Sequence, residues 1–299
     1  MIISYVVLHY LTADDTIECV RSLLNNVIPY SEDEHHIVIV DNGSPNDSYK
    51  ELEEEFGYNR NIVLLRNKAN LGFAKGNNTG FLYAKYELGS DFILLLNNDT
   101  YIEQRNFADV LTEKYQETNY AVLGPDIVTG EGYHQNPAIV KEKWSFTELS
   151  VFRIKARVKM LLTLLNVPSF NDYLTQREIN YQRKEMIPGD ISGVRLHGAC
   201  LIFSPVFISR FDGLYDKTFL YMEEDILKLI ADHYGLKMLY SSSLQIFHKE
   251  HAATKVELTD DSKRRINYYR QQIRSSIIFQ KLKWHLIRED ISKNGIKNE

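Results

Sequence analysis

Four apolar runs alternate with helix-like segments in the first 125 residues, and this alternation constrains the fold more than any other feature. The runs have the sequences IISYVVL, HIVIV, NIVLL and DFILLL and cover residues 2–8, 36–40, 61–65 and 91–96. Continuous apolar runs of this length are typical of strands buried on both faces. Strands that alternate with helices imply right-handed crossovers, so we predict an α/β fold with a largely parallel sheet between helices.

The segments between these runs carry helix signals. After the first run, Asp14, Asp15 and Thr16 offer N-caps, and apolar residues follow at helical spacing: Ile17, Val20, Leu23, Leu24 and Val27. After the second run, Ser48 and Glu51 form a capping-box pattern. After the third, we expect a glycine-bearing loop, NKANLGFAKGNN, and then a helix through TGFLYAKYEL that stops near Gly89.

Charge and cysteine content exclude several classes of protein. The 35 basic residues are outnumbered by 40 acidic ones, and the net charge of -5 argues against a nucleic-acid partner. Cys19 and Cys200 are the only cysteines, so a disulfide framework is not expected and a reducing cytoplasm fits best. The N-terminal MIISYVVLHY lacks the basic flank of a signal peptide, and no apolar run approaches the ~20 residues that span a bilayer.

Polar loops follow three of the predicted strands, at the edge where parallel sheets bind ligands. They read LHYLTADD, DNGSPND and NNDT. Asn97, Asn98 and Asp99 would project oxygen atoms into that crevice, and oxygen ligands suit Mg²⁺ or Mn²⁺ held together with phosphates. The alternative is that NNDT is only a turn, because Asn, Asp and Thr are common turn and N-cap residues.

Two nucleotide-binding fingerprints are missing. The loop after the first run contains no glycine, so a G-x-G-x-x-G motif is absent from its required position, and no G-x-x-x-x-G-K-[ST] motif occurs. Hydride transfer with a nicotinamide and P-loop hydrolysis are therefore disfavoured. A nucleotide diphosphate bridged by a metal to a carboxylate remains, which is the donor chemistry of sugar transfer.

Five ordered motifs resemble those of the family 2 glycosyltransferases. They are VDNGSPND, NLGFAKGNNTG, LLNNDT, HGACLIFSP and FLYMEEDILKLIADHYGLKMLYSSSLQIFHKE. The chain is most similar to the rhamnosyltransferase-like branch, which builds bacterial surface polysaccharides. The resemblance implies a GT-A fold, with a Rossmann-like sheet, a helical insertion and a C-terminal helical segment.

The resemblance also implies the donor site. Asp41 would meet the base, with His9 and Tyr10 beside it, and NLGFAKGNN would lie along the nucleotide. Gly72 and Gly76 would let the backbone pass close to the ligand, although a plain loop before a helix would have the same composition. The full set of expected nucleotide-sugar contacts is His9, Tyr10, Asp41, Asn42, Gly43, Leu71, Gly72, Phe73, Gly76, Asn77, Asn97, Asn98, His197 and Gly198.

The expected metal ligands are Asp99, Asn97 and His248. NNDT takes the place of the family's D-x-D, so Asn97 offers a neutral carbonyl oxygen where an aspartate is usual. The resemblance places a metal-binding histidine at the FHKE position, which is His248. We therefore expect Mn²⁺ or Mg²⁺ as the cofactor. Asn97 either lowers the affinity of the site for the ion or leaves the ion to arrive mainly with the nucleotide.

Glu224 is the expected catalytic base. Related enzymes carry an acidic pair before a helix that a glycine closes, and counting back from Gly235 assigns the pair to Glu223 and Glu224. Successive helical residues point ~100° apart, so the three neighbouring acids cannot all face one cleft. Asp225 is the alternative base. All three could also be acids that the helix dipole favours in a first turn.

Two basic amphipathic segments lie in the second half of the chain. One has the apolar stripe Val151, Ile154, Val158, Leu161 and Leu165 between the basic residues Arg153, Lys155, Arg157 and Lys159. The other is SKRRINYYRQQIRSSIIFQKLKW, at residues 262–284. The stripe either packs onto the main domain or contacts a membrane surface. We divide the chain into a nucleotide-sugar half at 1–125, an acceptor half at 126–255 with a helical insertion near 144–186, and a basic helical segment at 256–299.

The sequence thus predicts an inverting, metal-dependent glycosyltransferase. The expected donor is a UDP- or dTDP-sugar, with dTDP-rhamnose as the leading candidate. The expected acceptor is a glycan or a lipid-linked glycan at the inner face of the cytoplasmic membrane. Two alternatives are a sugar-phosphate nucleotidyltransferase, which should carry a glycine- and lysine-rich loop after the first strand, and a catalytically weak module that binds nucleotide sugars.

Overall fold

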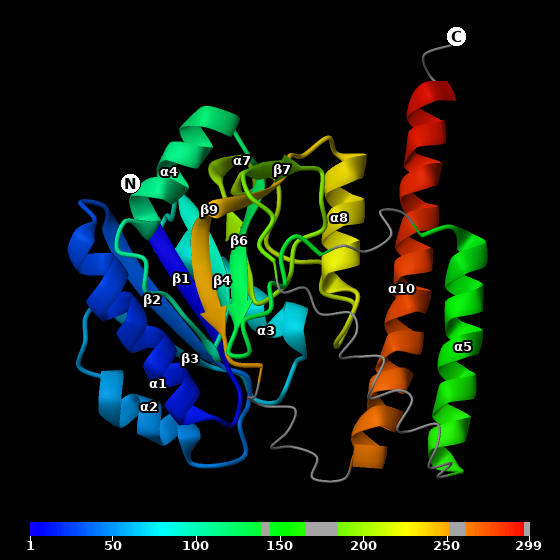
Figure 1. Cartoon of the computed structure of the whole chain (residues 1–299), viewed down its shortest axis with the longest axis horizontal. Coiled ribbons are helices and arrows are strands. Elements are labelled where there is room, and N and C mark those ends of the chain that lie inside the picture. The colour runs from blue at the N-terminus through cyan, green and yellow to red at the C-terminus, as the bar shows by residue number, and fades with distance from the viewer. Residues whose placement is uncertain (139–143, 166–184, 251–260, 296–299) are drawn as a thin grey trace.

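A computed structural model describes residues 1–138, 144–165, 185–250 and 261–295 (Figure 1). Its strands are β1 Ile2–His9, β2 Glu34–Asp41, β3 Ile62–Arg66, β4 Phe92–Asn97, β5 Thr100–Tyr101, β6 Val122–Thr129, β7 Asp190–Ser192, β8 Cys200–Phe203 and β9 Met238–His248. Its helices are α1 Ala13–Ser22, α2 Ser48–Phe56, α3 Phe73–Tyr86, α4 Phe107–Thr118, α5 Phe146–Leu164, α7 Pro205–Ile208, α8 Glu223–His233 and α10 Asp261–Gly295. A π-helical turn at Leu23–Val27 and a 3-10 turn at Ile28–Tyr30 continue α1.

The described strands form one mixed sheet. Its order is β3-β2-β1-β4-β8-β6-β9-β5, and β7 pairs with β9. The four strands of the first half are parallel to one another, as the alternating sequence pattern predicts. Strand β8 is antiparallel to both of its neighbours, and β6 runs parallel to β9. The predicted LQIF strand is the last part of the longer β9.

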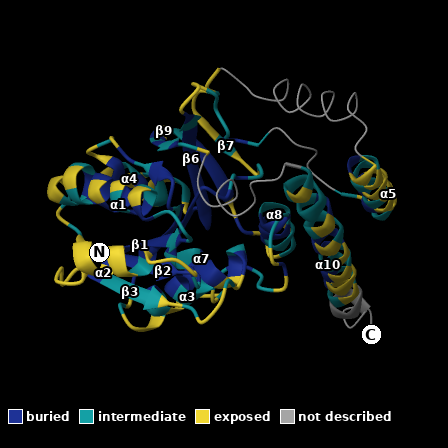
Figure 2. Ribbon diagram, turned by 90° about the horizontal axis from the view of Figure 1, so that it is seen from below, coloured by how far each residue is buried: buried dark blue, intermediate teal, exposed yellow. Residues whose placement is uncertain are grey.

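Two hydrophobic layers cover the sheet, which is why its strands read as continuous apolar runs. Along β1, Ile3, Tyr5 and Val7 belong to a core shared with α1, α2 and α4, whereas Val6 belongs to a core shared with α3, α7 and α8. This alternation follows from the period of two in a strand. Figures 1 and 2 show these helices on opposite faces of the sheet. Cys19 and Cys200 are buried free thiols.

Three local helix predictions are wrong. Helix α1 begins at Ala13 after the N-cap Thr12, so the expected caps lie inside the helix. Asp47 is at the N-cap position of α2 but makes no side-chain capping bond. The Ser48 hydroxyl bonds to His9 Nε2 at 2.8 Å, a tertiary contact that replaces the expected capping box. Helix α3 begins at Phe73, inside the expected loop, because the Phe73 N–H donates to the carbonyl of Phe219 and orders this segment.

Helices α5 and α10 lie side by side at the end of the molecule farthest from β3 (Figures 1 and 2). A third core joins them to α8 through Leu149, Met222, Ile226, Phe279, Leu282 and Leu286. The buried residues of α5 are Leu149, Ala156 and Thr163, whereas its apolar stripe is exposed. The packing interpretation of that stripe is therefore wrong. Residues 166–184 of the expected insertion and the start of the C-terminal segment, 256–260, lie outside the described residues.

No helix within the four described ranges is long and apolar enough to cross a membrane.

Candidate active site

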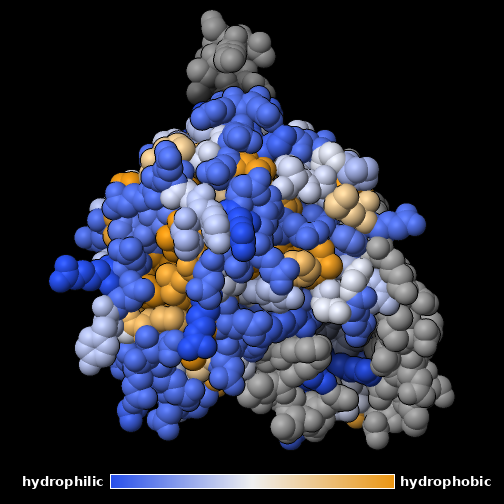
Figure 3. Space-filling view, turned by 60° about the vertical axis from the view of Figure 1, so that its left-hand side comes forward, coloured by the Kyte–Doolittle hydropathy of each residue, from blue (hydrophilic) through white to orange (hydrophobic). Residues whose placement is uncertain are grey.

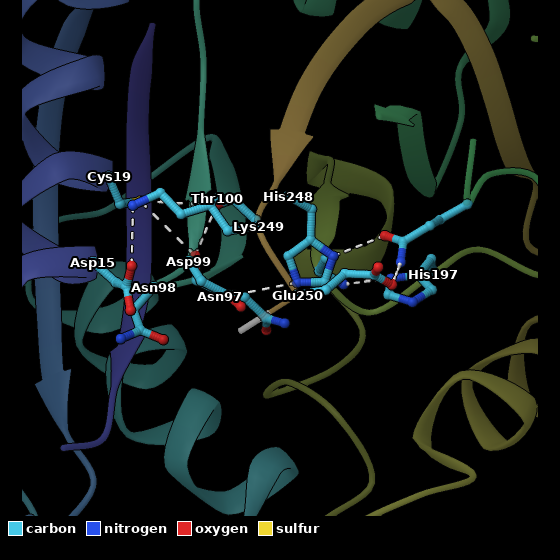
Figure 4. A network of polar contacts seen from close by, with 12 residues as sticks. Asp15, Cys19, Asn97, Asn98, Asp99, Thr100, His197, His248, Lys249 and Glu250 are labelled. Carbon is cyan, nitrogen blue, oxygen red and sulfur yellow. Dashed lines mark hydrogen bonds and ion pairs between the residues drawn. The ribbon is translucent and has the colours of Figure 1, made fainter. Parts of the chain in front are cut away.

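Antiparallel pairing between β5 and β9 builds the centre of the site. Thr100 lies opposite His248 in this pair, and the N–H of Lys249 donates to the carbonyl of Asp99 over 2.9 Å. The register therefore places the Asp99 carboxylate beside the His248 imidazole, with Oδ1 and Nε2 3.2 Å apart (Figure 4). Both side chains are buried. Two of the three expected metal ligands thus come together, although they are far apart in the sequence.

Gln135 fixes the orientation of the His248 ring. Its Nε2 donates to Glu250 Oε1 over 2.5 Å, because an ionised carboxylate can only accept. Its Oε1 consequently faces His248 Nδ1 at 2.8 Å and accepts the ring proton. His248 Nε2 then faces the Asp99 carboxylate, which can only accept. A buried pair of this kind requires a proton or a cation between its atoms.

The His197–Gly198 loop connects this pair to the acidic helix. The side chain of Asn136 holds the loop, because its Oδ1 accepts from the His197 N–H over 2.8 Å. The His197 ring meets His248 edge to face, with centroids 5.8 Å apart. Burial lowers the pKa of His197 and so favours a neutral ring, although the Glu224 charge acts in the opposite direction.

The structure gives the three neighbouring acids different environments. Glu224 Oε1 accepts from the Gly198 N–H over 2.9 Å, so this residue faces the loop of the site. Asp225 accepts from the Trp144 indole and pairs with Arg195, each at 3.0 Å, and burial raises its pKa. Glu223 is buried at the start of α8, and burial raises its pKa to about 7. Of the three, only Glu224 bonds to another expected site residue.

Asn42 organises the loop that precedes α3. Its Oδ1 accepts from Leu71 N–H and Asn67 Nδ2, and its Nδ2 donates to Gly72 O and Asn70 Oδ1. Asn42 is buried, and these four bonds satisfy the polar atoms of its side chain. An expected ligand contact is therefore also the internal support of the loop.

Two glycines permit close backbone approaches around this loop. Gly43 has φ +75°, and a Cβ there would lie 2.4 Å from the backbone of Ala69. Gly72 has φ +82°, and a Cβ there would lie 2.2 Å from the carbonyl oxygen of Phe219. The chain leading to α8 is thereby held against the start of α3.

The first turn of α3 lies against the rest of the site. A Cβ on Gly198 would lie 3.4 Å from the Phe73 ring and 3.3 Å from Glu224 Oε1. Gly76 packs tightly on Leu8 and Asn42. Asn77 is buried; its Nδ2 donates to Phe73 O, and its Oδ1 has no hydrogen-bond partner in the described structure.

Asp41 ends β2 and is fully buried. Its Oδ1 accepts from the Ser44 N–H at 3.0 Å, and its Oδ2 pairs with Arg66 Nε at 3.0 Å. The Arg66 guanidinium lies over the Tyr49 ring, with 4.7 Å to the centroid. Arg66 therefore lies beside Asp41 in the region where the base of the nucleotide is expected to bind. No motif in the sequence indicated this position for Arg66.

Several side chains that were expected to contact the nucleotide sugar make hydrogen bonds within the protein instead. Both ring nitrogens of His9 are engaged, Nδ1 by Thr16 and Nε2 by Ser48, and burial lowers its pKa to about 4. Asn98 donates to the Thr12 and Thr16 hydroxyls and so faces α1. Tyr10 is half-buried in the loop after β1, and Asn97 is half-buried at the end of β4. Their ligand roles stay predictions.

Sequence reasoning missed Gln135 and Lys249. Lys249 pairs with Asp15 at 3.0 Å (Figure 4). It also pairs with Glu18 at 2.5 Å, and the two contacts join the end of β9 to α1. The FHKE motif was a signal for Lys249, whereas Gln135 lies in a segment with no motif. Among the residues that the structure describes, no group of three or more His, Cys, Asp or Glu side chains could hold a metal.

Residues 4–178 match the family model described as Glycosyl transferase family 2. The match covers more than half of the chain, which therefore belongs to this family. The low-salt glycan biosynthesis hexosyltransferase Agl10 of Haloferax volcanii is 24% identical over 222 residues, which are 74% of this chain and 59% of that protein. The chain thus spans about three fifths of the length of this relative.

Solved structures share the fold. The S. aureus TarS 1-349 structure has a TM-score of 0.53 and 15% identity, and the match covers 83% of this chain and 60% of that one. The same fragment in complex with UDP-GlcNAc has a TM-score of 0.51 and 12% identity, over 85% and 60%. The fold is GT-A, as the sequence resemblance implies. At these identities the likeness concerns the fold alone.

Proposed function

We propose that the protein transfers a sugar from a nucleotide-diphosphate sugar to an acceptor hydroxyl, with inversion at the anomeric carbon. The observation that carries this proposal is the convergence of Asp99, His248 and Glu224 through one short loop. His197 of that loop contacts His248, and Gly198 binds Glu224. This arrangement supports a site for diphosphate charge beside a carboxylate base, which glycosyl transfer requires.

The donor set fits a divalent cation, Mn²⁺ or Mg²⁺. Asp99 and His248 would hold it, because His248 Nε2 and Asp99 Oδ1 lie 3.2 Å apart at one point of the site. Asn97 would add a neutral oxygen, and the donor phosphates would complete the coordination. A neutral imidazole among oxygen ligands favours Mn²⁺ over Mg²⁺. When bound, the cation stabilises negative charge on the diphosphate leaving group.

Glu224 is the proposed base. A carboxylate has two oxygens, so Glu224 can keep the Gly198 N–H on one and take the acceptor's proton with the other. Removing this proton as the hydroxyl attacks makes the acceptor oxygen a better nucleophile. The hydrogen bond from Gly198 holds the carboxylate in place before the substrates arrive. Asp225 is the alternative base, although Arg195 and Trp144 already occupy its oxygens.

The donor is proposed to be a UDP- or dTDP-sugar. A structural neighbour, TarS, has been solved with UDP-GlcNAc, and the Haloferax relative is named a hexosyltransferase of glycan biosynthesis. These names support a hexose on a nucleoside diphosphate. The choice of rhamnose, and of bacterial surface polysaccharide as the product, rests on the motif resemblance.

The acceptor is proposed to be a glycan, lipid-linked, at the inner face of the cytoplasmic membrane. The support for this location is the pair of basic helices, α5 and α10, that lie together at one end of the molecule (Figure 1). Such helices are attracted to anionic head groups. The protein would then associate peripherally with the membrane.

A thermal-shift screen tests the donor and the metal together. Nucleoside diphosphates and nucleotide sugars are added with and without Mn²⁺, because a ligand that binds only the folded form raises the apparent stability. We expect a UDP- or dTDP-sugar to stabilise the protein more with Mn²⁺ than without. Slow Mn²⁺-dependent hydrolysis of the same sugar nucleotide should accompany binding.

Two variants locate the metal in this screen. His248→Ala and Asp99→Asn should each remove the extra stabilisation by Mn²⁺, measured against each variant's own melting temperature without ligand, which should be lower than that of the parent because one partner of a buried pair is lost. Equal Mn²⁺ dependence in parent and His248→Ala would remove His248 from the ligand set. Stabilisation by a nucleoside triphosphate and a sugar phosphate, without sugar-nucleotide hydrolysis, would favour the nucleotidyltransferase instead.

A further inference from the structure

The outward face of α5 carries a continuous row of apolar side chains. Val151, Ile154, Val158, Leu161, Leu164 and Leu165 expose between 43% and 64% of their surface. The buried residues of the same helix, Leu149, Ala156 and Thr163, face the opposite side toward α10. Large apolar side chains exposed as a contiguous patch indicate an interaction surface. The apolar row therefore needs a partner outside the described structure.

Basic residues border this row on both sides. At 100° per residue, Lys155 and Lys159 lie on one side of the row, and Arg153 and Arg157 lie on the other. From Leu149 to Leu165 the segment contains no acidic residue, although the whole chain has a net charge of -5. By contrast, the face turned away from α5 is mostly hydrophilic, with its apolar residues interrupted by polar ones (Figure 3).

A cleft between α5 and α10 continues the surface. It has a volume of about 600 Å³ and is lined by Phe146, Arg153, Ile277, Gln280, Lys281 and Trp284. Trp284 is 53% exposed and meets Phe146 edge to face. Arg153 donates from one nitrogen to Ser150, but its Nη1 is buried without a hydrogen-bond partner in the described structure. A buried guanidinium nitrogen without a partner indicates that an anion belongs nearby.

We infer that α5 is the membrane-docking element and that its outward face binds anionic phospholipid. The apolar row would enter the acyl boundary, the flanking Lys and Arg side chains would reach the head groups, and Trp284 would lie at the interface. This inference rests on the proposed membrane location and assigns it to one helix. Charge complementarity decides the occupant, because a second copy of α5 would bring like charges together.

Vesicle binding tests the inference. The full chain is sedimented with sucrose-loaded vesicles of phosphatidylcholine alone or mixed with an equal part of phosphatidylglycerol. We expect binding to the anionic vesicles only, and weaker binding at high salt because surface charges are screened over ~8 Å at physiological ionic strength. Absence of binding to anionic vesicles at low salt would overturn the inference.

Matched variants assign the binding to α5. The triple variant Ile154→Ser, Val158→Ser, Leu161→Ser should weaken binding by ~10-fold or more for each side chain. Its control is Tyr58→Ser with Leu82→Ser, two exposed apolar residues elsewhere. Lys155→Gln with Arg157→Gln should weaken binding by ~5-fold for each charge, whereas Lys50→Gln with Arg60→Gln, which are exposed on and beside α2, should not.

Two further measurements separate the competing outcomes. Sedimentation equilibrium of the parent should give a monomer; a dimer that the triple variant dissociates would assign the face to a second copy and overturn the inference. Nucleotide-sugar stabilisation is measured on the same proteins without lipid. If nucleotide sugars do not stabilise the parent, the proposed transferase function is overturned. Vesicle binding would still test the membrane-docking role of α5. An unchanged response in the triple variant would show that its donor site is intact.

Discussion

The carboxyl edge of the sheet and the α5–α10 pair show opposite exceptions to the usual burial of apolar residues and exposure of polar ones. At the sheet edge, polar and ionisable side chains such as Asp41, Asp99 and His248 are buried and held by internal bonds. On α5, large apolar side chains are exposed instead. Buried polar groups and exposed apolar patches are the two informative exceptions to the usual partition. The first indicates a site for small charged ligands, and the second a surface for a larger partner.

The two regions should respond to substitution largely independently. The site joins β4, β9, α3 and the start of α8, whereas α5 packs mainly on α10. The third core and the Trp144–Asp225 hydrogen bond join the α5 segment to α8, so effects of substitutions away from this contact should add. The substitutions that follow are chosen to change one region and leave the other unaffected.

Glu224→Gln should produce the largest effect, on the chemical step alone. The amide oxygen can still accept from the Gly198 N–H, but it cannot take a proton. We expect sugar transfer to fall by roughly 10²–10⁴-fold, because general-base catalysis acts in the transition state. Binding of the nucleoside diphosphate with Mn²⁺ should be retained in a calorimetric titration.

Asp225→Asn is the comparison for this variant. It weakens the pairing with Arg195 and leaves Glu224 untouched, so we expect lower stability but nearly normal transfer per folded molecule. Near-normal transfer by Glu224→Gln and a collapse in Asp225→Asn would assign the base to Asp225.

Glu223→Gln should change how stability depends on pH. Burial raises the pKa of Glu223 from 4.5 to about 7, so between these values the folded state binds more protons than the unfolded state. Stability therefore falls as pH rises through this window, by up to ~3 kcal/mol. Urea unfolding of both proteins between pH 4.5 and pH 7.5 should show that the parent loses stability relative to the variant as pH rises, because the lowered pKa values of His9 and His197 contribute an opposite trend equally to both proteins. A variant whose stability runs parallel to that of the parent across this window would exclude Glu223 as the titrating group. Glu224→Gln should run parallel to the parent.

Gln135→Leu should weaken binding of the proposed metal ion without changing its proposed ligands. The substitution removes the acceptor that keeps the proton of His248 on Nδ1. Loss of such an outer partner typically lowers metal affinity by ~10–100-fold. Mn²⁺ affinity is measured by electron paramagnetic resonance of the free ion. Gln104→Leu is the control, because Gln104 also bonds to β9, through Ser243 and Gln245, but does not contact His248. Equal losses in both variants would indicate a general effect on β9.

The fold was predictable because its signals are local. The apolar runs that form β1 to β4, and the helices between them, recur with the periods of strand and helix, and each is recognisable without its neighbours. Asp99 and His248 were also found, because each belongs to a motif. The Asp99–His248 contact itself depends on β5 pairing with β9, which no local pattern encodes.

The remaining parts depend on tertiary contacts. Gln135 lies outside every motif, and its role follows only from its position between His248 and Glu250. The stripe on α5 was visible as a pattern, yet amphipathicity alone does not decide whether an apolar face is covered. Its exposure became evident only when Leu149 and Ala156 were found on the side that packs toward α10.

Ser145→Ala should have the smallest effect and should fall on α5 alone. Two Ser-x-x-Glu patterns lie at the start of a helix, at Ser48 and Ser145, and only the second forms a capping box. Ser145 Oγ accepts from the Glu148 N–H, and Glu148 Oε2 accepts from the Ser145 N–H. Losing an N-cap costs ~1 kcal/mol, so the first turn of α5 should open more often.

Hydrogen exchange measures this opening directly. Amides in the first turn of α5 should exchange ~5-fold faster in Ser145→Ala, since ~1 kcal/mol corresponds to about that factor, whereas amides of β1 and β4 should be unchanged. Thr147→Ala is the control, because Thr147 lies in the same turn without capping it. Donor-induced stabilisation should remain equal to that of the parent. Faster exchange in β1 or β4 would mean that the sheet edge and the α5–α10 pair are coupled. The assumption that substitutions in one region leave the other unaffected would then be wrong.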